Sequence, residues 1–146
     1  MSAVPDLSIV VLSWNTEDLL RACLESLARI EPGLAIETIV VDNASSDGSA
    51  AMVRDRYPDV RLIVNDRNVG YAEGNNVGIR AARGRHLFLL NSDTEVAPDA
   101  PRRLVEHLDA HPACGAVGAK LLNPDGTVQR ACMRFPGFGV LVGFDT

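Results

Sequence analysis

His86 to Thr94 reads His-Leu-Phe-Leu-Leu-Asn-Ser-Asp-Thr, and this stretch predicts both an element of the fold and a binding site. Its four consecutive apolar residues, 87–90, are too few for a membrane span but fit a strand buried on both faces, as in a parallel sheet covered by helices. The apolar run ends at Asn91, Ser92 and Asp93, whose side chains all carry oxygen. A carboxylate at the end of a buried strand can hold a divalent cation, whose other ligands are waters and phosphate oxygens.

A simpler interpretation of the same residues stays open. Asp93 and Thr94 are turn formers, and they could do no more than prepare the helix expected in the region of Pro98. The tripeptide alone does not decide between the two interpretations, so the rest of the chain has to.

The pattern of a short apolar run followed by helical spacing recurs along the chain. Strands are predicted at 7–12, 36–41, 60–64 and 87–90, and helices at 18–30, 49–57, 70–83 and from Pro98 to His111. Strands that alternate with helices predict a mostly parallel, doubly wound α/β sheet flanked by helices. Ligands of such sheets bind outside the carboxyl ends of the strands. Polar residues follow all four predicted strands, at 13–15, 42–43, 65–68 and 91–93. We therefore expect them to converge on one site.

Three local expectations accompany this fold. Asn15 is placed to cap the helix that follows the first strand. Glycines at 70, 74 and 78 would share one face of a helix and let a neighbouring backbone or a ligand come close. Ala116 to Ala119 could form a short strand.

Composition limits the class of protein. The 146 residues, 47% hydrophobic and 23% charged, suit one soluble domain. A net charge of -5 argues against a nucleic-acid partner, because nothing supplies a basic face. Cys23, Cys114 and Cys132 are far apart and odd in number, so we interpret them as reduced thiols of a cytosolic protein. Residues 1–6 do not read as a signal peptide, and no run reaches the ~20 apolar residues of a spanning helix.

The common nucleotide-binding and hydrolase motifs are missing. No Gly-x-Gly-x-x-Gly follows the first strand, and there is neither a Gly-x-x-x-x-Gly-Lys-Ser/Thr loop nor a Gly-x-Ser-x-Gly elbow. A response-regulator receiver would need acidic residues directly after the first strand, where this chain has Ser13-Trp14-Asn15. These absences disfavour a dinucleotide-binding fold, a P-loop phosphotransferase, an α/β hydrolase and a receiver.

Four segments in fixed order resemble family 2 glycosyltransferases. They are Ser-Ile-Val-Val-Leu-Ser-Trp-Asn (8–15), Ile-Val-Val-Asp-Asn-Ala-Ser-Ser-Asp-Gly-Ser (39–49), Asn-Val-Gly-Tyr-Ala-Glu-Gly-Asn-Asn (68–76) and Leu-Leu-Asn-Ser-Asp-Thr (89–94). The nearest likeness is to bacterial rhamnosyltransferase-type members that build cell-surface polysaccharide, and it covers about residues 7–134. The resemblance implies a GT-A fold, in which a nucleotide-binding α/β half precedes an acceptor-binding half.

The resemblance also implies roles for residues at the first two strand ends. Asp42 matches the acid that binds the uracil or thymine base, whose imide N–H a carboxylate accepts. The alternative for Asp42 is a turn residue that caps the helix after Ser46. Ser13, Trp14 and Asn15 match the segment beneath the base and ribose, although Trp14 could equally serve packing.

The later motifs match the sugar and metal ends of the family's donor site. Asn68, Gly70, Asn75 and Asn76 match the segment near the nucleotide and sugar, although either adjacent amide could simply cap a helix. Residues 91–93 match the family's Asp-x-Asp metal motif, with an asparagine in place of the first aspartate. The resemblance therefore implies a weakened Mg²⁺ or Mn²⁺ site centred on Asp93, together with Asn91 and Ser92. The cation would stabilise charge on the departing nucleoside diphosphate.

The implied reaction is inverting, metal-dependent transfer of a sugar from a UDP- or dTDP-sugar, such as dTDP-rhamnose, to a glycan or lipid-linked acceptor. In the family the general base lies in the second half, so we expect it beyond Thr146; Asp145, next to the end of the chain, is a poor candidate. We therefore expect residues 1–146 to be a single GT-A-type domain, a donor-binding portion without its acceptor-binding half. Its expected location is the cytoplasm, peripheral at the inner membrane in the full-length protein.

Other outcomes stay open at this point. The chain could be a non-catalytic nucleotide-binding or assembly module, which would bind nucleotide without dependence on metal. A sugar-phosphate nucleotidyltransferase is a more remote option, because the basic glycine-rich loop that its chemistry uses is absent near the amino terminus. The apolar residues Val140, Leu141, Val142 and Phe144 would suit self-association into a homo-oligomer.

Overall fold

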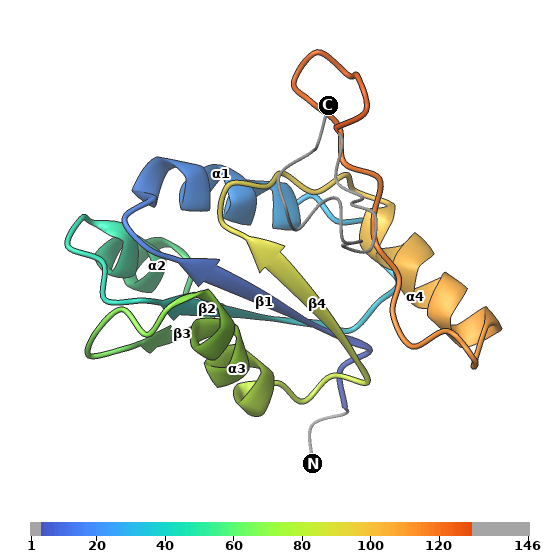
Figure 1. The fold of residues 1–146 in the computed structure, drawn as a ribbon, viewed down its shortest axis with the longest axis horizontal. Helices are drawn as coiled ribbons and strands as arrows, with labels where there is room; N and C mark the ends of the chain where they lie inside the picture. The colour runs from blue at the N-terminus through green and yellow to red at the C-terminus, as the bar shows by residue number, and fades with distance from the viewer. Residues whose placement is uncertain (1–3, 130–146) are drawn as a thin grey trace, which may run out of the picture.

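The computed structural model describes residues 4–129, which form a parallel β-sheet with helices on both faces (Figure 1). The strands are β1 (Leu7–Ser13), β2 (Ile36–Asp42), β3 (Arg61–Val64) and β4 (His86–Asn91), in the order β3-β2-β1-β4. The helices are α1 (Glu17–Leu27), α2 (Ser49–Arg56), α3 (Tyr71–Ala81) and α4 (Ala100–Ala110). Every strand pair is parallel, which confirms the predicted doubly wound α/β architecture.

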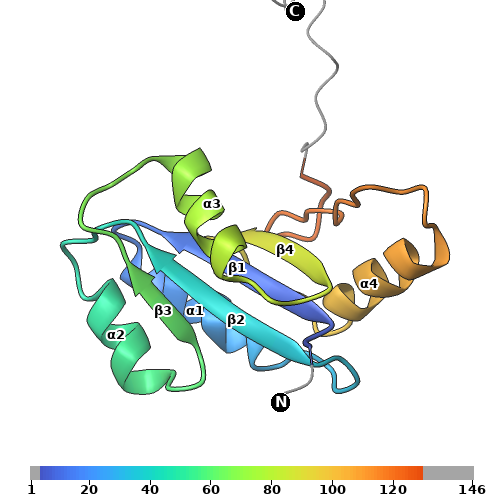
Figure 2. The same ribbon diagram turned by 90° about the horizontal axis from the view of Figure 1, so that it is seen from below.

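The two faces of the sheet carry separate apolar cores. Helices α1, α2 and α4 lie on one face, where Ile9 and Val11 of β1 are fully buried. Helix α3 lies alone on the other face, over Val10 of β1 and Ile39 and Val41 of β2 (Figure 2). Because β1 is central and has helices on both sides, almost all of its residues are buried, as a continuous apolar run predicts.

The expectation that residues 87–90 are buried on both faces is wrong. Phe88 and Leu90 pack into the core under α1, but Leu87 and Leu89 are each 46% exposed. The reason is strand order: β4 is at the edge of the described sheet, and α3 packs on β1 and β2. The apolar run therefore identified the strand, but not its exposed face.

Two of the three spaced glycines let α3 approach β1 closely. A Cβ atom at Gly78 would collide with Val10 Cγ1, and one at Gly74 would lie 2.5 Å from Leu12 Cδ1. The group that lies close to these two glycines is thus a set of β1 side chains. Gly70 differs from the other two, because it precedes α3 at φ +83°, a left-handed conformation that glycine adopts without strain.

Two expected elements near the end of the described chain also differ. Residues 116–119 form no strand, since they have no pairing partner within residues 4–129; an isolated antiparallel bridge joins Leu122 and Val128 instead. Helix α4 begins at Ala100, so Pro101 occupies its first turn and Pro98 precedes it. The span from residue 4 to residue 129 contains no helix long and apolar enough to cross a membrane.

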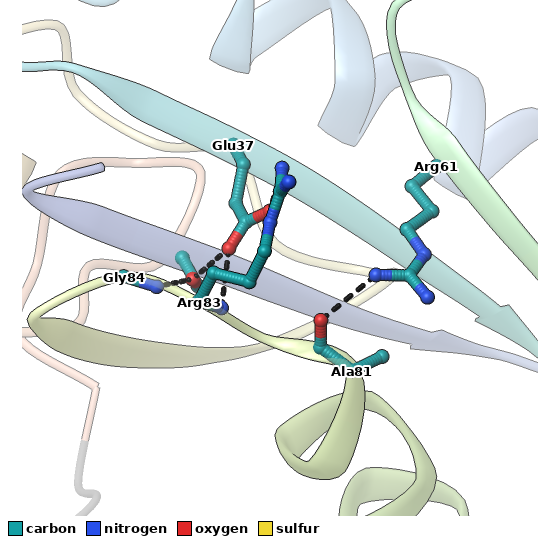
Figure 3. Close-up of polar contacts among 6 residues, drawn as sticks. Glu37, Arg61, Ala81, Arg83 and Gly84 are labelled. Atoms are coloured by element: carbon teal, nitrogen blue, oxygen red, sulfur yellow. Dashed lines mark hydrogen bonds and ion pairs between the residues drawn. The ribbon is translucent and has the colours of Figure 1, made fainter. Parts of the chain in front are cut away.

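A polar network at the amino-terminal end of the sheet fixes the link between α3 and β4 (Figure 3). Glu37 of β2 accepts hydrogen bonds from Ser8 of β1 (2.6 Å) and from the backbone and guanidinium of Arg83 (2.6–3.1 Å). Ser8 in turn accepts the Gly84 N–H at 2.7 Å. The Glu37 side chain is 11% exposed, and its carboxylate joins two strands and the incoming β4 link, while its partner Arg83 is largely exposed.

Candidate functional site

The described chain has a cavity of about 370 Å³ at the carboxyl ends of the strands. Segments that follow all four strands contribute to its lining, as the parallel order requires. Seven of the residues singled out from the sequence lie here: Ser13, Trp14, Asn68, Gly70, Asn91, Ser92 and Asp93. The predicted convergence of polar strand ends is therefore confirmed, while their binding roles stay predictions.

Asn15, Asp42 and Asn75 lie outside this lining. Asn75 is buried in α3, where its amide donates to the Tyr71 carbonyl at 2.9 Å. Asn76 is exposed and contacts Glu73 of the same helix. Both amides of the Asn-Asn pair thus make contacts within their own helix.

Asp42 ends β2 and is 1% exposed. Its Oδ2 accepts the Ser45 N–H at 2.9 Å, while its Oδ1 has no hydrogen-bond partner among the described residues. The turn interpretation is therefore correct in part, but Asp42 does not cap α2, since that helix begins at Ser49. A buried carboxylate oxygen without a partner is unfavourable, so a donor beyond the described residues would stabilise Asp42.

The sequence placed Asn43 among the converging strand ends but assigned it no role, and in the structure it organises one wall of the cavity. Its amide donates to Asn68 Oδ1 (2.9 Å) and to the Gly70 carbonyl (3.2 Å). Its Oδ1 accepts from Asn65 Nδ2 and the Val69 N–H, both at 3.1 Å. One buried side chain therefore uses its full hydrogen-bonding capacity to hold the loop before α3. Its place directly after Asp42 at a strand end was the available signal.

Asn15 does not cap α1, contrary to expectation. The residue has φ +53°, and its backbone N–H donates to Ser45 Oγ at 2.9 Å. Its Oδ1 accepts from the Ser46 N–H at 2.7 Å. Because those partners lie in the loop after β2, Asn15 joins the first two loops of the site instead of ending a helix.

Asp47 reinforces the same junction by bonding to two helix starts. Its Oδ2 accepts the Glu17 N–H of α1 at 3.0 Å, and its Oδ1 accepts the Ser49 N–H of α2 at 2.9 Å. Desolvation tends to raise the pKa of Asp47, but these hydrogen bonds outweigh it and hold the pKa below its ordinary value. A charged acceptor at two helix amino termini is favourable, so the loops before α1 and α2 are fixed together.

The loop after β4 carries the residues that the sequence predicts as a metal site. Asp93 is exposed and is the only acid among the described residues that line the cavity, with Asn91 beside it. Within residues 4–129 no cluster of three or more His, Cys, Asp or Glu residues could hold a metal ion. One carboxylate and an amide fit Mg²⁺ or Mn²⁺ when waters and ligand phosphates complete the coordination, and they do not fit a site made of protein ligands alone.

Cys23 lies behind this loop, with its thiol facing the Asn91 carbonyl at 3.9 Å. Burial, assisted by the charges of Asp93 and Glu95, raises the pKa of the Cys23 thiol to about 12. Cys23 and Cys114 are both free thiols, as expected. The predictions for Cys132, Asp145 and the apolar residues at 140–144 concern positions outside the described residues.

A second cavity, of about 330 Å³, lies at the opposite end of β4. Most of the residues that line it have apolar side chains, with Leu104 and Leu108 of α4 among them. The charged residue Arg85 lies in its lining and is already paired with Asp6 and Asp109. This cavity lacks the convergent polar strand ends, so the carboxyl edge is the stronger candidate site.

The fold and the carboxyl-edge cavity define a GT-A type α/β protein, and sequence comparison identifies its family. The profile described as Glycosyl transferase family 2 matches residues 8–137, and the chain belongs to this family. A succinoglycan biosynthesis protein, ExoO of Rhizobium meliloti, is 44% identical over 109 residues, which are 73% of this chain and 31% of that relative. The chain thus spans about a third of that relative's length.

Solved structures agree on the fold. A mannosyltransferase of Pyrobaculum calidifontis, solved with GDP-Man and Mn²⁺, superposes with a TM-score of 0.68 at 25% identity, over 85% of this chain and 37% of its own. TarS of S. aureus, residues 1–349 solved with UDP, superposes with a TM-score of 0.67 at 22% identity, over 73% of this chain and 33% of its own. The similarity to TarS is evidence for the fold alone.

Proposed function

We propose that this chain binds the nucleoside diphosphate sugar donor of a glycosyltransferase, and that the whole protein transfers the sugar to a glycan or lipid-linked acceptor in polysaccharide biosynthesis. The observation that carries the proposal is the cavity at the carboxyl ends of four parallel strands, lined in part by Ser, Thr, Asn and Asp side chains, together with a buried Asp42 oxygen that has no partner among the described residues. The relative named for succinoglycan biosynthesis and the mannosyltransferase solved with GDP-Man and Mn²⁺ support it.

In this proposal the donor lies across the cavity from β2 to β4. The Asp42 carboxylate accepts the imide N–H of a uracil or thymine base, with Trp14 and Ser13 beneath the base and ribose. Because Asp42 is buried and outside the cavity lining, the loop after β2 must shift slightly for the base to reach it. The diphosphate lies by Asn91 and Asp93, and the sugar points toward the loop that Asn43 holds.

A divalent cation would be held by Asp93 together with the donor's phosphate oxygens, and when bound it supplies Lewis-acid stabilisation of the leaving diphosphate. Inverting transfer also needs a base to take the proton from the acceptor hydroxyl. Asp93 is the only acid among the lining residues that the structure describes, so the proposal places that base elsewhere in the protein. It places the whole protein at the cytoplasmic side of the membrane, with a rhamnosyl donor as one option among UDP- and dTDP-sugars.

Calorimetric titration with UDP, dTDP and GDP, with and without Mn²⁺, tests the proposal. UDP or dTDP should bind, and Mn²⁺ should tighten the binding. Asp93→Ala should abolish the dependence of nucleotide binding on Mn²⁺. Asp55→Ala removes the same charge from an exposed position on α2 and should leave that dependence intact. Binding that ignores both the metal and Asp93→Ala would favour a plain nucleotide-binding module. No binding of any nucleotide would refute the proposal.

A further inference from the structure

Thr16 occupies the N-cap position of α1 but does not act as a cap. A threonine there normally accepts a hydrogen bond from a backbone N–H in the first turn of its helix. The Thr16 side chain makes no such bond; Asp47, from the loop after β2, supplies an acceptor to the start of this helix through the Glu17 N–H. The Thr16 hydroxyl is therefore available for another purpose.

That hydroxyl connects the end of β1 to the end of β4. Thr16 Oγ1 lies 3.0 Å from Ser13 Oγ and 2.9 Å from Ser92 Oγ. All three residues line the carboxyl-edge cavity, and both serines are buried. The backbone ladder between the two strands ends at the pair Leu12–Asn91, one position before these serines. The hydroxyl chain thus continues the connection where the ladder stops.

The chemistry of the chain leaves one group available to a ligand. Three hydroxyls carry three protons, and two hydrogen bonds use two of them, whichever way the bonds run. The remaining O–H belongs to Ser92 if the bonds run from Ser13 to Ser92, to Ser13 if they run the opposite way, and to Thr16 if both serines donate to it. In each arrangement one hydroxyl that lines the cavity keeps an O–H that can donate to an acceptor atom of a ligand.

We propose that Thr16 is a positioning residue of the donor site. Its hydroxyl holds Ser92, and with it the adjacent Asp93, at a fixed place relative to Ser13 on β1. The inference rests on the proposed function, because Asp93 then serves the metal and diphosphate end of the donor while Ser13 serves the base and ribose end. Loss of the hydroxyl should reduce the gain in donor affinity that the metal causes more than it reduces the affinity without metal.

The matched variants are Thr16→Val, which keeps the shape but loses both hydrogen bonds, and Thr16→Ser, which keeps the hydroxyl. Valine removes no cap bond, because the threonine side chain makes none. In the full chain, the gain in UDP affinity caused by Mn²⁺ should fall about tenfold in Thr16→Val, and stay within about twofold of wild type in Thr16→Ser. Hydrogen exchange of residues 91–96 should accelerate in Thr16→Val only.

Glu37→Gln is the control for a general loss of stability, since it weakens the sheet at the end opposite the cavity. It should lower the melting temperature and leave the effect of Mn²⁺ on UDP affinity unchanged. If the control reduces that effect as much as Thr16→Val does, the inference is wrong.

The two measurements separate the inference from the proposed function. If wild type takes up no nucleotide, the proposed function fails, whereas exchange still decides the positioning: unchanged exchange in Thr16→Val overturns it, and faster exchange of 91–96 supports it. If wild type binds UDP and Thr16→Val keeps the full effect of Mn²⁺, the inference is overturned while the proposed function stands.

Discussion

Replacing Glu37 with glutamine should weaken the sheet at the end opposite the cavity. The carboxylate accepts four hydrogen bonds, from Ser8 Oγ and from three nitrogens of Arg83, and its side chain is 11% exposed. Glutamine has almost the same shape, but its amide nitrogen is a donor and would face donors in the network. The variant therefore loses the negative charge and at least one acceptor.

The magnitude follows from these contacts. A hydrogen bond to a charged group contributes about 1.5–3 kcal/mol, although water around the largely exposed Arg83 side chain screens its part. We expect a loss of about 2–3 kcal/mol in the free energy of unfolding, and a melting temperature about 5–10 °C lower. Urea denaturation followed by circular dichroism measures the first quantity directly.

The effect should depend on pH in a defined direction. Burial tends to raise the pKa of Glu37, but hydrogen bonds from Ser8 and Arg83 outweigh it and hold the pKa below its ordinary value of 4.5. The stabilisation is therefore fully present above pH 4.5 and is lost as pH falls through the lower, folded-state pKa. The stability gap between wild type and Glu37→Gln should be constant near neutral pH and narrow in acid.

Glu73→Gln is the matched control, because Glu73 forms an exposed ion pair with Arg80 on α3 at 2.6 Å. Exposed pairs contribute little, so this variant should lose far less stability than Glu37→Gln. The reasoning would be refuted if the two variants lost equal stability, or if acid left the gap for Glu37→Gln unchanged.

Three other substitutions or reactions test separate parts of the structure. Asn43→Ala strips four hydrogen bonds from the cavity wall, so it should cost about 2–3 kcal/mol in urea denaturation and abolish nucleotide binding in calorimetry; retained binding would contradict its role. Gly78→Ala drives a methyl group into a β1 side chain, so it should lower the free energy of unfolding by about 1–3 kcal/mol, although alanine has the better helix propensity. The control Gly115→Ala has open space around the new methyl group and should change stability by less than about 0.5 kcal/mol. Cys23, with a pKa near 12, should resist iodoacetamide at pH 8 in the folded protein while half-buried Cys114 reacts, and mass spectrometry showing equal rates would contradict its burial.

The order and type of the elements could be predicted from sequence because both depend on local pattern. The apolar runs gave four strands, and their alternation with helices gave a parallel sheet whose polar ends meet. Exposure of Leu87 and Leu89 could not be predicted in this way. It depends on which strand is at the edge, and a four-residue apolar run is the same at an edge as at the centre.

The same contrast between local pattern and tertiary arrangement applies to the residues of the site. Residues directly after strands were found, because parallel strands bring their carboxyl ends together. The roles of Asn15, Asn43 and Thr16 could not be predicted, since each has a partner from another loop. A polar residue before a helix normally caps it, but here the side chain of Asp47 reaches across and takes that position, leaving Asn15 and Thr16 to bind elsewhere.

Strand β1 pairs with two strands that the ribosome synthesises at very different times. Its partner β2 begins 29 residues after Leu7, at Ile36, but its partner β4 begins 79 residues after Leu7, at His86. At ribosomal rates of roughly 5–20 residues per second, β1 waits on the order of 4–16 s with one edge open. Pulsed hydrogen exchange should accordingly show β1 amides that face β4 gaining protection after those that face β2. The loop with Asp93 is then the last part of the site to reach its place, so a nascent chain cannot hold its ligand until the sheet is complete.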